Sequence, residues 1–374
     1  MSLFGPILLA ACALLPCPAL AQFKDNEKST PGGPKLSEKE EVQRIKVGLI
    51  VRADGGPVAG LYGTVPLPMD WPEQKVTVVD EEFSSPVKRG TDKVTDRSVK
   101  QLVVRIPQLK TGQTAKALVT LEIRRRAILP PDDTSGLSIP DKPDASLRVY
   151  LAPSPMIEST DKRIKQLAKD LLADKETDWQ KVEALYDGVR SKVTYKNGPL
   201  KGALKALKDG TGDCEEMTSL FIAVCRASGI PARTVWVTGH CYPEFYLVDA
   251  KGDGHWFPCQ AAGSRAFGGI PEHRPILQKG DNFRDPDRPG ERMRYLSEHV
   301  TGKSFKGSGR PHVKFVRQDV ATEKPLEPTE EAAPQIPPPE TPDETESKPE
   351  EPKAEEPKTD EPPAEEPQTD EVGR

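Results

Sequence analysis

The chain has 374 residues, with 53 Lys and Arg against 58 Asp and Glu, which gives a formal net charge of −5. The basic residues are scattered and match no nucleic-acid-binding motif, so we exclude a nucleic-acid partner. Without its apolar start and its Pro- and Glu-rich end, the chain keeps roughly 300 residues, which is enough for two domains with cores of their own.

Residues 1–21 predict a signal peptide. They are apolar and end in Ala19-Leu20-Ala21, the small-residue pattern that precedes signal-peptidase cleavage, although the usual basic start is missing. Leu9-Ala10-Ala11-Cys12 also matches a lipoprotein cleavage box. Because two prolines interrupt the apolar run, we expect no stable membrane span. We therefore expect a secreted or periplasmic protein, with a lipoprotein and a chain that is not exported as the alternatives.

The next part of the chain predicts a β-domain. Residues 22–40 are polar and contain a Pro-Gly-Gly-Pro sequence, which favours a flexible lead. Residues 41–130 then show short strand patterns separated by Gly, Pro, Asp and Thr clusters, without a helical period. These strand patterns lie at 44–51, 58–65, 75–79, 99–106 and 115–123. We interpret 41–130 as a β-sandwich and the Pro- and Asp-rich residues 131–154 as a linker.

Helical patterns begin after the linker, and the best-marked helix starts at Cys214. Asp213 is a good N-cap and Glu216 stands where a capping box needs it. A buried stripe at helical spacing follows, and the helix is expected to end at Gly229, before Pro231. Earlier helices are expected over 160–173 and 178–193.

Cys214 therefore falls in the first helical turn, where free backbone N–H groups and the helix dipole favour a thiolate. His240 lies 26 residues later in a strand pattern. A thiol at a helix start and a distant imidazole are the minimum apparatus of a cysteine nucleophile. The alternative is an inert, packed thiol; we assign that role to Cys225, which lies within the apolar stripe.

Three segments carry a family resemblance: Gly212-Asp213-Cys214-Glu215-Glu216, then Arg226-Ala227-Ser228-Gly229-Ile230-Pro231-Ala232-Arg233, then His240 with Trp256. Together they resemble the bacterial transglutaminase-like family, whose fold is related to papain-like thiol enzymes. The resemblance covers about 168–263. It implies an α+β core of helices packed on an antiparallel sheet, placed here at 155–318, with Cys214 as nucleophile and His240 as base.

The third catalytic position departs from that family. The family usually has an aspartate where this chain has Gln260. A glutamine carbonyl accepts the imidazole N–H and fixes its tautomer, but it supplies no charge for the imidazolium. Two outcomes stay open: a working triad that is differently tuned, or a degenerate site. Glu244 and Asp253 are substitutes for orienting His240.

Residues 240–248 and 255–260 are expected to pair as a hairpin around Ala250. Cys241 would then oppose Cys259, and a disulfide between them would lock the register of the triad. The alternative is two free thiols. We also name two supporting residues. Asp213 caps the helix, and Tyr195 stands where the family often has an aromatic residue near the site. A metal site built from these thiols and imidazoles is disfavoured, because their spacing is unlike that of zinc ligands.

From residue 319 to residue 374 the chain is rich in Pro, Glu, Thr and Lys and predicts a disordered tail. Residues 321–374 hold 18 acidic and 5 basic side chains, so the tail is acidic.

We interpret the protein as a secreted thiol enzyme that acts on amide bonds of proteins or peptides through a Cys thioester. Hydrolysis or deamidation is favoured over crosslinking. The alternative is a catalytically degenerate binding or scaffold protein with the same fold. We expect no cofactor and no metal, and the sequence leaves the oligomeric state open.

Overall fold

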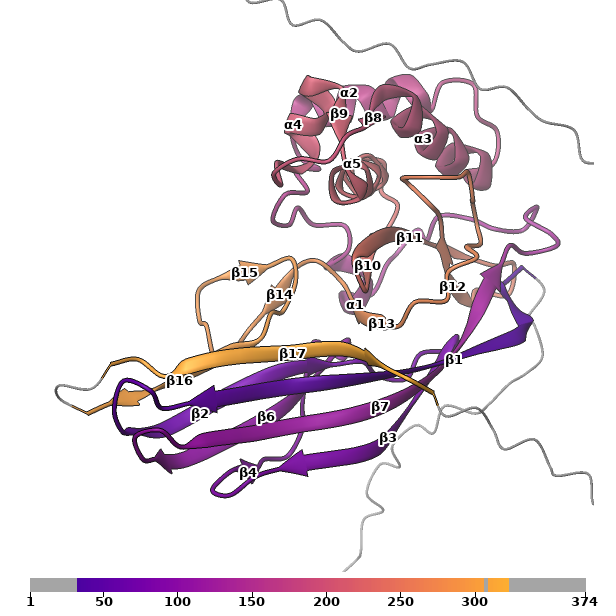
Figure 1. The fold of residues 1–374 in the computed structure, drawn as a ribbon. Helices are drawn as coiled ribbons and strands as arrows, with labels where there is room; N and C mark the ends of the chain where they lie inside the picture. Colours follow the sequence, from indigo (N-terminus) through magenta and orange to yellow (C-terminus); the bar gives the residue numbers. More distant parts are fainter. Residues whose placement is uncertain (1–31, 306–308, 323–374) are drawn as a thin grey trace, which may run out of the picture. The chain divides into compact units, whose positions relative to one another are not determined.

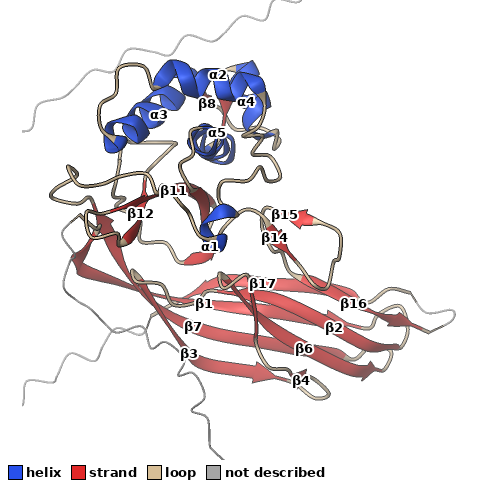
Figure 2. Cartoon of the chain, turned by 180° about the vertical axis from the view of Figure 1, so that it is seen from behind, coloured by secondary structure: helices blue, strands red, loops and turns tan. Residues whose placement is uncertain are grey.

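The computed structural model describes residues 32–305 and 309–322 (Figure 1). The predicted signal peptide and nearly all of the predicted acidic tail lie outside these residues. The described chain is mixed α and β, with strands predominating over helices (Figure 2). Within the described residues, no helix combines the length and the apolar character needed to cross a membrane.

Two antiparallel sheets form the β-domain. One has the order β17-β1-β7-β3, and the other has the order β16-β2-β6-β4 with β5 added beside β6. The strands of the first sheet are β1 (Lys35–Arg52), β3 (Gln74–Phe83), β7 (Thr114–Leu129) and β17 (His312–Val320). Those of the second are β2 (Val58–Leu67), β4 (Lys88–Arg89), β5 (Lys93–Thr95), β6 (Val99–Leu109) and β16 (His299–Ser304).

The two sheets share one apolar core, the arrangement expected of a sandwich. In β1, Ile45, Val47, Leu49 and Val51 are buried at every second position, whereas Lys46 and Ile50 between them are less buried, so one face of the strand points inward. Buried side chains of β2, β6 and β7 join the same cluster. The two-residue period therefore identifies the inner face of these strands.

Strand β1 starts earlier than predicted, because Lys35–Arg52 includes part of the predicted flexible lead 22–40. The first residues of β1 show no alternation of apolar and polar side chains. Arginines of the partner strand compensate for the negative charge of its acidic side chains. Glu40 and Glu41 pair in register with Arg126 and Arg125 of β7. The Arg124 guanidinium also donates to the Glu40 carboxylate at 3.2 Å.

The chain also returns to the β-domain at its end. Strand β16 pairs with β2, and β17 pairs with β1 from Arg44 to Arg52. These strands fall inside the range 155–318 that we assigned to the catalytic-type domain, and β17 extends into the predicted tail from 319. This assignment was wrong because each strand completes its pairing with a segment more than 200 residues earlier in the chain.

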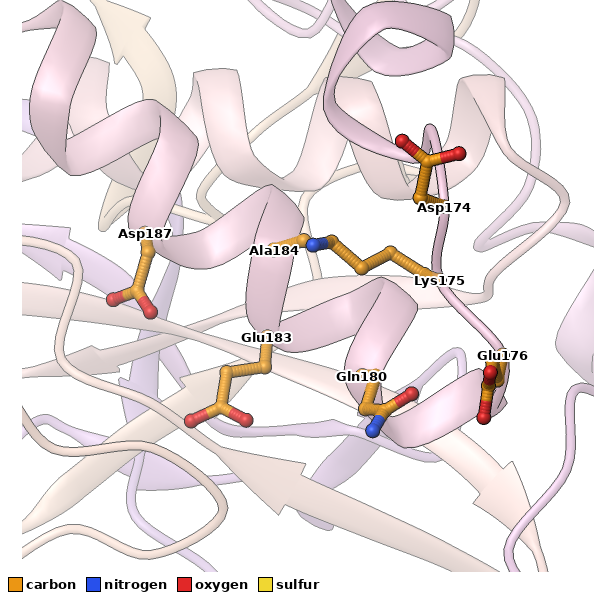
Figure 3. A pocket seen from close by; sticks show the side chains of 7 residues that line it. All are labelled: Asp174, Lys175, Glu176, Gln180, Glu183, Ala184 and Asp187. Atoms are coloured by element: carbon orange, nitrogen blue, oxygen red, sulfur yellow. The ribbon is translucent and has the colours of Figure 1, made fainter.

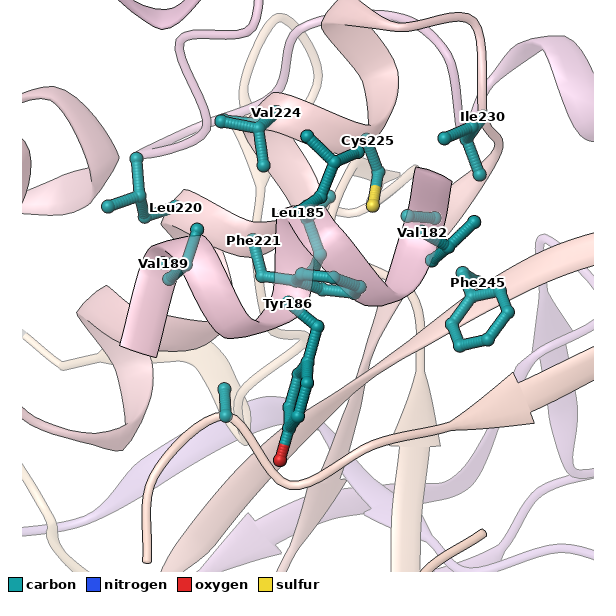
Figure 4. Packing of buried hydrophobic residues seen from close by; sticks show 14 of the residues in the cluster. Val182, Leu185, Tyr186, Val189, Leu220, Phe221, Val224, Cys225, Ile230 and Phe245 are labelled. Atoms are coloured by element: carbon teal, nitrogen blue, oxygen red, sulfur yellow. The ribbon is translucent and has the colours of Figure 1, made fainter. Parts of the chain in front are cut away.

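The second folded region surrounds one buried helix, α5 (Cys214–Ala227). The other helices are α1 (Ala145–Arg148), α2 (Lys162–Leu171), α3 (Asp178–Lys192) and α4 (Gly202–Asp209). Side chains of α3 and α5 pack together with Phe245 (Figure 4). Because α5 is buried on nearly all sides, its first turn is held in a fixed position.

A four-stranded antiparallel sheet of order β12-β11-β10-β13 accompanies these helices. Its strands are β10 (Ala232–Val237), β11 (His240–Val248), β12 (Gly254–Pro258) and β13 (Ile276–Lys279). Two small sheets complete the fold: β8 (Thr194–Tyr195) with β9 (Thr211–Gly212), and β14 (Phe283–Arg284) with β15 (Arg292–Met293). The predicted combination of helices and an antiparallel sheet is therefore present.

A buried charge network joins this sheet to the loop before β3. Lys279 donates to Glu73 at 2.6 Å and to Glu244 at 2.7 Å, and Glu244 also binds Arg233 at 2.7 Å. The Arg233 guanidinium lies 4.0 Å from the ring centre of Trp256. Burial raises the pKa of Glu244, but the two cations outweigh it and hold the pKa below its ordinary value.

Glu244→Gln should lower the free energy of unfolding by about 3–5 kcal/mol, because it leaves buried cations short of a partner. Urea denaturation at neutral pH measures this loss. Since the pKa of Glu244 is lowered on folding, its stabilisation is present above the unfolded pKa and disappears as the pH falls. The difference between wild type and variant should therefore shrink below about pH 4.

The control is Glu82→Gln, because the Glu82 carboxylate pairs with Lys116 at an exposed position. This change should cost about 1 kcal/mol or less. Equal losses in the two variants would contradict a structural role for the buried network.

Candidate active site

Three local features fix Cys214 at the first position of helix α5. The Asp213 carboxylate accepts from the Glu215 N–H at 2.8 Å, and the Glu216 carboxylate accepts from the Asp213 N–H at 3.1 Å. Both halves of the predicted capping box are therefore present. Gly212 is required beside them, because a Cβ at this position would lie 2.5 Å from the Glu216 Cβ.

Glu216 also reaches backward along the chain, where it accepts from the Lys201 N–H at 2.9 Å. Burial raises the pKa of Asp213 to about 6, and the neighbouring Glu216 adds to this effect. Asp213 thus supports the site as a cap of the helix that carries Cys214.

His240 is positioned by a two-residue turn, Thr238-Gly239, between β10 and β11. Gly239 takes the left-handed conformation with φ +66°, which glycine adopts without strain. In such a hairpin the closing pair, here Val237 and His240, is hydrogen-bonded, and the next pair is not. The N–H of Cys241 therefore points away from β10, and it donates to the Cys214 sulfur.

The structure brings His240 and Gln260 together as the resemblance implied. The His240 Nε2 lies 3.1 Å from the Gln260 Oε1. Since a carbonyl oxygen only accepts, Nε2 carries the proton, and this leaves Nδ1 for the hydrogen bond with Cys214. Burial lowers the pKa of His240, but its hydrogen bonds to Cys214 and Gln260 outweigh this effect and raise it.

Cys214 itself is partly buried and strongly acidic for a thiol. A hydrogen bond from the Cys241 thiol is the largest influence, and His240 adds to it, so that the pKa of Cys214 falls to about 4 although burial opposes the shift. The ordinary value for a cysteine is about 8.5. At neutral pH the arrangement is therefore a thiolate beside an imidazole whose pKa is raised.

Two side chains of α3 hold the segment that carries Gln260. The Tyr186 hydroxyl donates to the Gln260 carbonyl at 2.8 Å and accepts from the Ala266 N–H at 3.1 Å. The Arg190 guanidinium donates to the carbonyls of Gln260 and Gly263 at 2.9 Å and 2.7 Å. Neither residue was predicted from the sequence, where their spacing of four on one helix face was the only signal.

The other predicted supporting residues lie elsewhere. Glu244 does not orient His240, because its carboxylate is taken up by Arg233 and Lys279. Tyr195 is 53% exposed, and its hydroxyl donates to Asn197 at 2.9 Å. The structure therefore shows no contact that would give Tyr195 a role at the thiol.

The predicted disulfide between Cys241 and Cys259 is wrong, since both thiols are free. Cys259 donates its N–H to the Pro243 carbonyl, so the hairpin register differs by two residues from the predicted one. Cys241 instead contacts Cys214, with its Sγ 3.6 Å from the Cys214 carbonyl oxygen. Among the described residues, no group of three or more His, Cys, Asp or Glu side chains is placed to hold a metal ion.

Charged residues flank the thiol. Glu215, next to Cys214, pairs with Arg294, which lies 5.0 Å from the ring centre of Trp236.

A separate pocket of about 360 Å³ on α3 is lined mainly by acidic side chains (Figure 3). Its lining is Asp174, Lys175, Glu176, Gln180, Glu183, Ala184 and Asp187, and it contains none of the predicted site residues.

A sequence model of the transglutaminase-like superfamily matches residues 165–261. This range contains Cys214, His240 and Gln260. Over this segment the chain is similar to the transglutaminase-like superfamily. No curated protein sequence matches it.

Two solved structures are similar to this chain. A proposed cysteine protease from Cytophaga hutchinsonii is 17% identical, with a TM-score of 0.47, and the match covers 76% of this chain and 94% of that one. A proposed protease from Parabacteroides distasonis is 13% identical, with a TM-score of 0.24, and the match covers 56% of this chain and 47% of that one. At these scores neither structure informs the chemistry of this site.

The rate of Cys214 alkylation by iodoacetamide should be nearly independent of pH above about pH 6, because the thiolate forms at a pKa of about 4. An ordinary cysteine would gain about tenfold per pH unit up to about pH 8. In His240→Ala the thiolate loses one of its stabilising partners, so the alkylation profile should move to higher pH. Peptide mass spectrometry after timed labelling measures both profiles.

The matched control is His312→Ala, which removes an exposed imidazole on β17 and should leave the profile unchanged. A wild-type profile that rises steadily to about pH 8 would contradict a preformed thiolate.

Proposed function

We propose that the protein is a thiol enzyme that hydrolyses or deamidates amide bonds in proteins or peptides. The observation that carries this proposal is the aligned series formed by the Cys214 sulfur, the His240 ring and the Gln260 amide. The low pKa of the thiol supports a nucleophile, and the raised pKa of the imidazole supports a proton donor for the leaving amine.

In the first step the Cys214 sulfur attacks the carbonyl carbon, and a C–S bond forms. The C–N bond then breaks as the imidazolium of His240 gives its proton to the leaving amine. The product is a thioester on Cys214. We propose that the backbone N–H of Cys214, at the helix start, stabilises the oxyanion, a contribution that is typically about 3 kcal/mol.

In the second step a water molecule attacks the thioester, and His240 takes its proton. The C–S bond breaks, a carboxylic acid leaves, and the thiolate returns. A primary amine in place of water would give a crosslink. We propose water as the acceptor and a protein or peptide as the substrate. We also propose that the reaction takes place after export, through the predicted signal peptide at 1–21.

The test combines a peptidyl vinyl sulfone, which traps a catalytic thiol, with carboxamide-containing peptides analysed by mass spectrometry. We expect an adduct on Cys214 and products of hydrolysis or of ammonia loss, without incorporation of an added primary amine. Cys214→Ala should abolish both the adduct and the products. Cys225→Ala removes a buried thiol of the same helix and should retain both. Identical products from Cys214→Ala would contradict the mechanism.

Substitutions of Gln260 separate a working triad from a degenerate scaffold. Gln260→Ala removes the acceptor for the His240 Nε2–H, and kcat/KM for peptide hydrolysis should fall about 10²-fold or more. Gln260→Asp places a negative charge beside the imidazolium and should raise the pKa of His240 further, so that the alkaline limb of the rate profile moves to higher pH.

The control Gln166→Ala alters a glutamine on α2 that donates to Asp170 on the surface and should change neither quantity. Activity that appears only with Gln260→Asp, from an inactive wild type, would favour the scaffold alternative.

A further inference from the structure

Cys241 contacts the nucleophile but has no part in the proposed mechanism. It follows His240 directly and is 1% exposed. Two groups of Cys241 contact Cys214. Its N–H donates to the Cys214 sulfur, and its thiol, which donates to the Cys214 carbonyl oxygen at 3.6 Å, also lies within hydrogen-bonding reach of that sulfur. The two sulfurs are therefore neighbours.

We propose that Cys214 and Cys241 form a reversible disulfide when the protein meets a peroxide, so that this pair is an oxidative modification site. The formation of the bond depends only on the two thiols. Its consequence, reversible loss of activity, rests on the proposed function of Cys214 as nucleophile.

The first step is the oxidation of Cys214, which is partly exposed to solvent, whereas Cys241 is buried. Its thiolate sulfur attacks one oxygen of hydrogen peroxide. An S–O bond forms, the O–O bond breaks, hydroxide leaves, and Cys214 becomes a sulfenic acid. Thiolates that are acidic and reachable from solvent are the sites at which this reaction occurs.

The second step is condensation with Cys241. In the resting protein the hydrogen bond to the Cys214 thiolate raises the pKa of Cys241, and burial raises it further. Conversion of Cys214 to a neutral sulfenic acid removes the neighbouring negative charge, so Cys241 loses its proton more easily. Its sulfur then attacks the Cys214 sulfur, the S–S bond forms, the S–O bond breaks, and water leaves with the proton of Cys241.

The protein contains its own control pair, Cys225 and Cys259. Both thiols are fully buried and free, they are close enough to interact, and burial raises the pKa of each. They lack an acidic member that solvent reaches. Oxidation should therefore select Cys214 with Cys241 and leave Cys225 with Cys259 reduced.

The experiment treats the reduced full-length protein with a small excess of hydrogen peroxide, alkylates the remaining thiols, and maps all cysteines by peptide mass spectrometry. We expect a Cys214–Cys241 cross-linked peptide that dithiothreitol removes. Labelling of Cys214 by the peptidyl vinyl sulfone should be lost on oxidation and return on reduction. In Cys241→Ala and Cys241→Ser, dimedone should trap a sulfenic acid on Cys214, and more peroxide should convert it irreversibly to the sulfinic acid.

Over-oxidation of Cys214 in the wild type while Cys241 stays reduced would overturn the proposal, as would a Cys225–Cys259 bond in its place. Because mass mapping requires no turnover, this failure is distinguishable from failure of the proposed function. A disulfide in a protein without amidase activity would keep the modification site and reject the enzyme. An active enzyme in which the disulfide does not form would reject the modification site and keep the proposed function.

Discussion

The contact between the first turn of α5 and the first residues of β11 is the constraint on which the site depends. Cys214 opens the helix, and the hairpin turn before His240 aims both the imidazole and the Cys241 N–H at its sulfur. Neither element supplies the chemistry alone. The helix brings a partly buried thiol at the start of a buried body, and the strand brings hydrogen-bond donors that lower its pKa.

The charges of the domain serve two separate purposes. Glu244, Arg233 and Lys279 are buried and neutralise one another beside the sheet, where removal of a single partner is costly. The pair formed by Cys214 and His240 is less buried and is tuned by neutral donors and acceptors, among them Gln260. A neutral residue such as Gln260 is sufficient beside His240, because the Cys214 thiolate already supplies the negative charge that stabilises a protonated imidazole.

The sequence predicted the local features of the site well, because they depend on residues that are neighbours in the chain. The capping of α5 by Asp213 and Glu216 is one case, and the β-strand that carries His240 is another. The hairpin register was predicted less well. The Asp249 carboxylate accepts from the N–H groups of Lys251 and Asp253 and forms a wider turn than expected, which displaces Cys259 from Cys241.

By itself, the sequence determined that a thiol starts a helix, that an imidazole starts a strand, and that the third position is a glutamine. Only the tertiary structure decided that Cys241 faces Cys214, that Tyr186 and Arg190 hold the Gln260 segment, and that β17 completes the N-terminal sheet. The physical reason is that helix caps and strand periods are set within a few residues. Contacts between distant segments depend on register and packing, which no local pattern records.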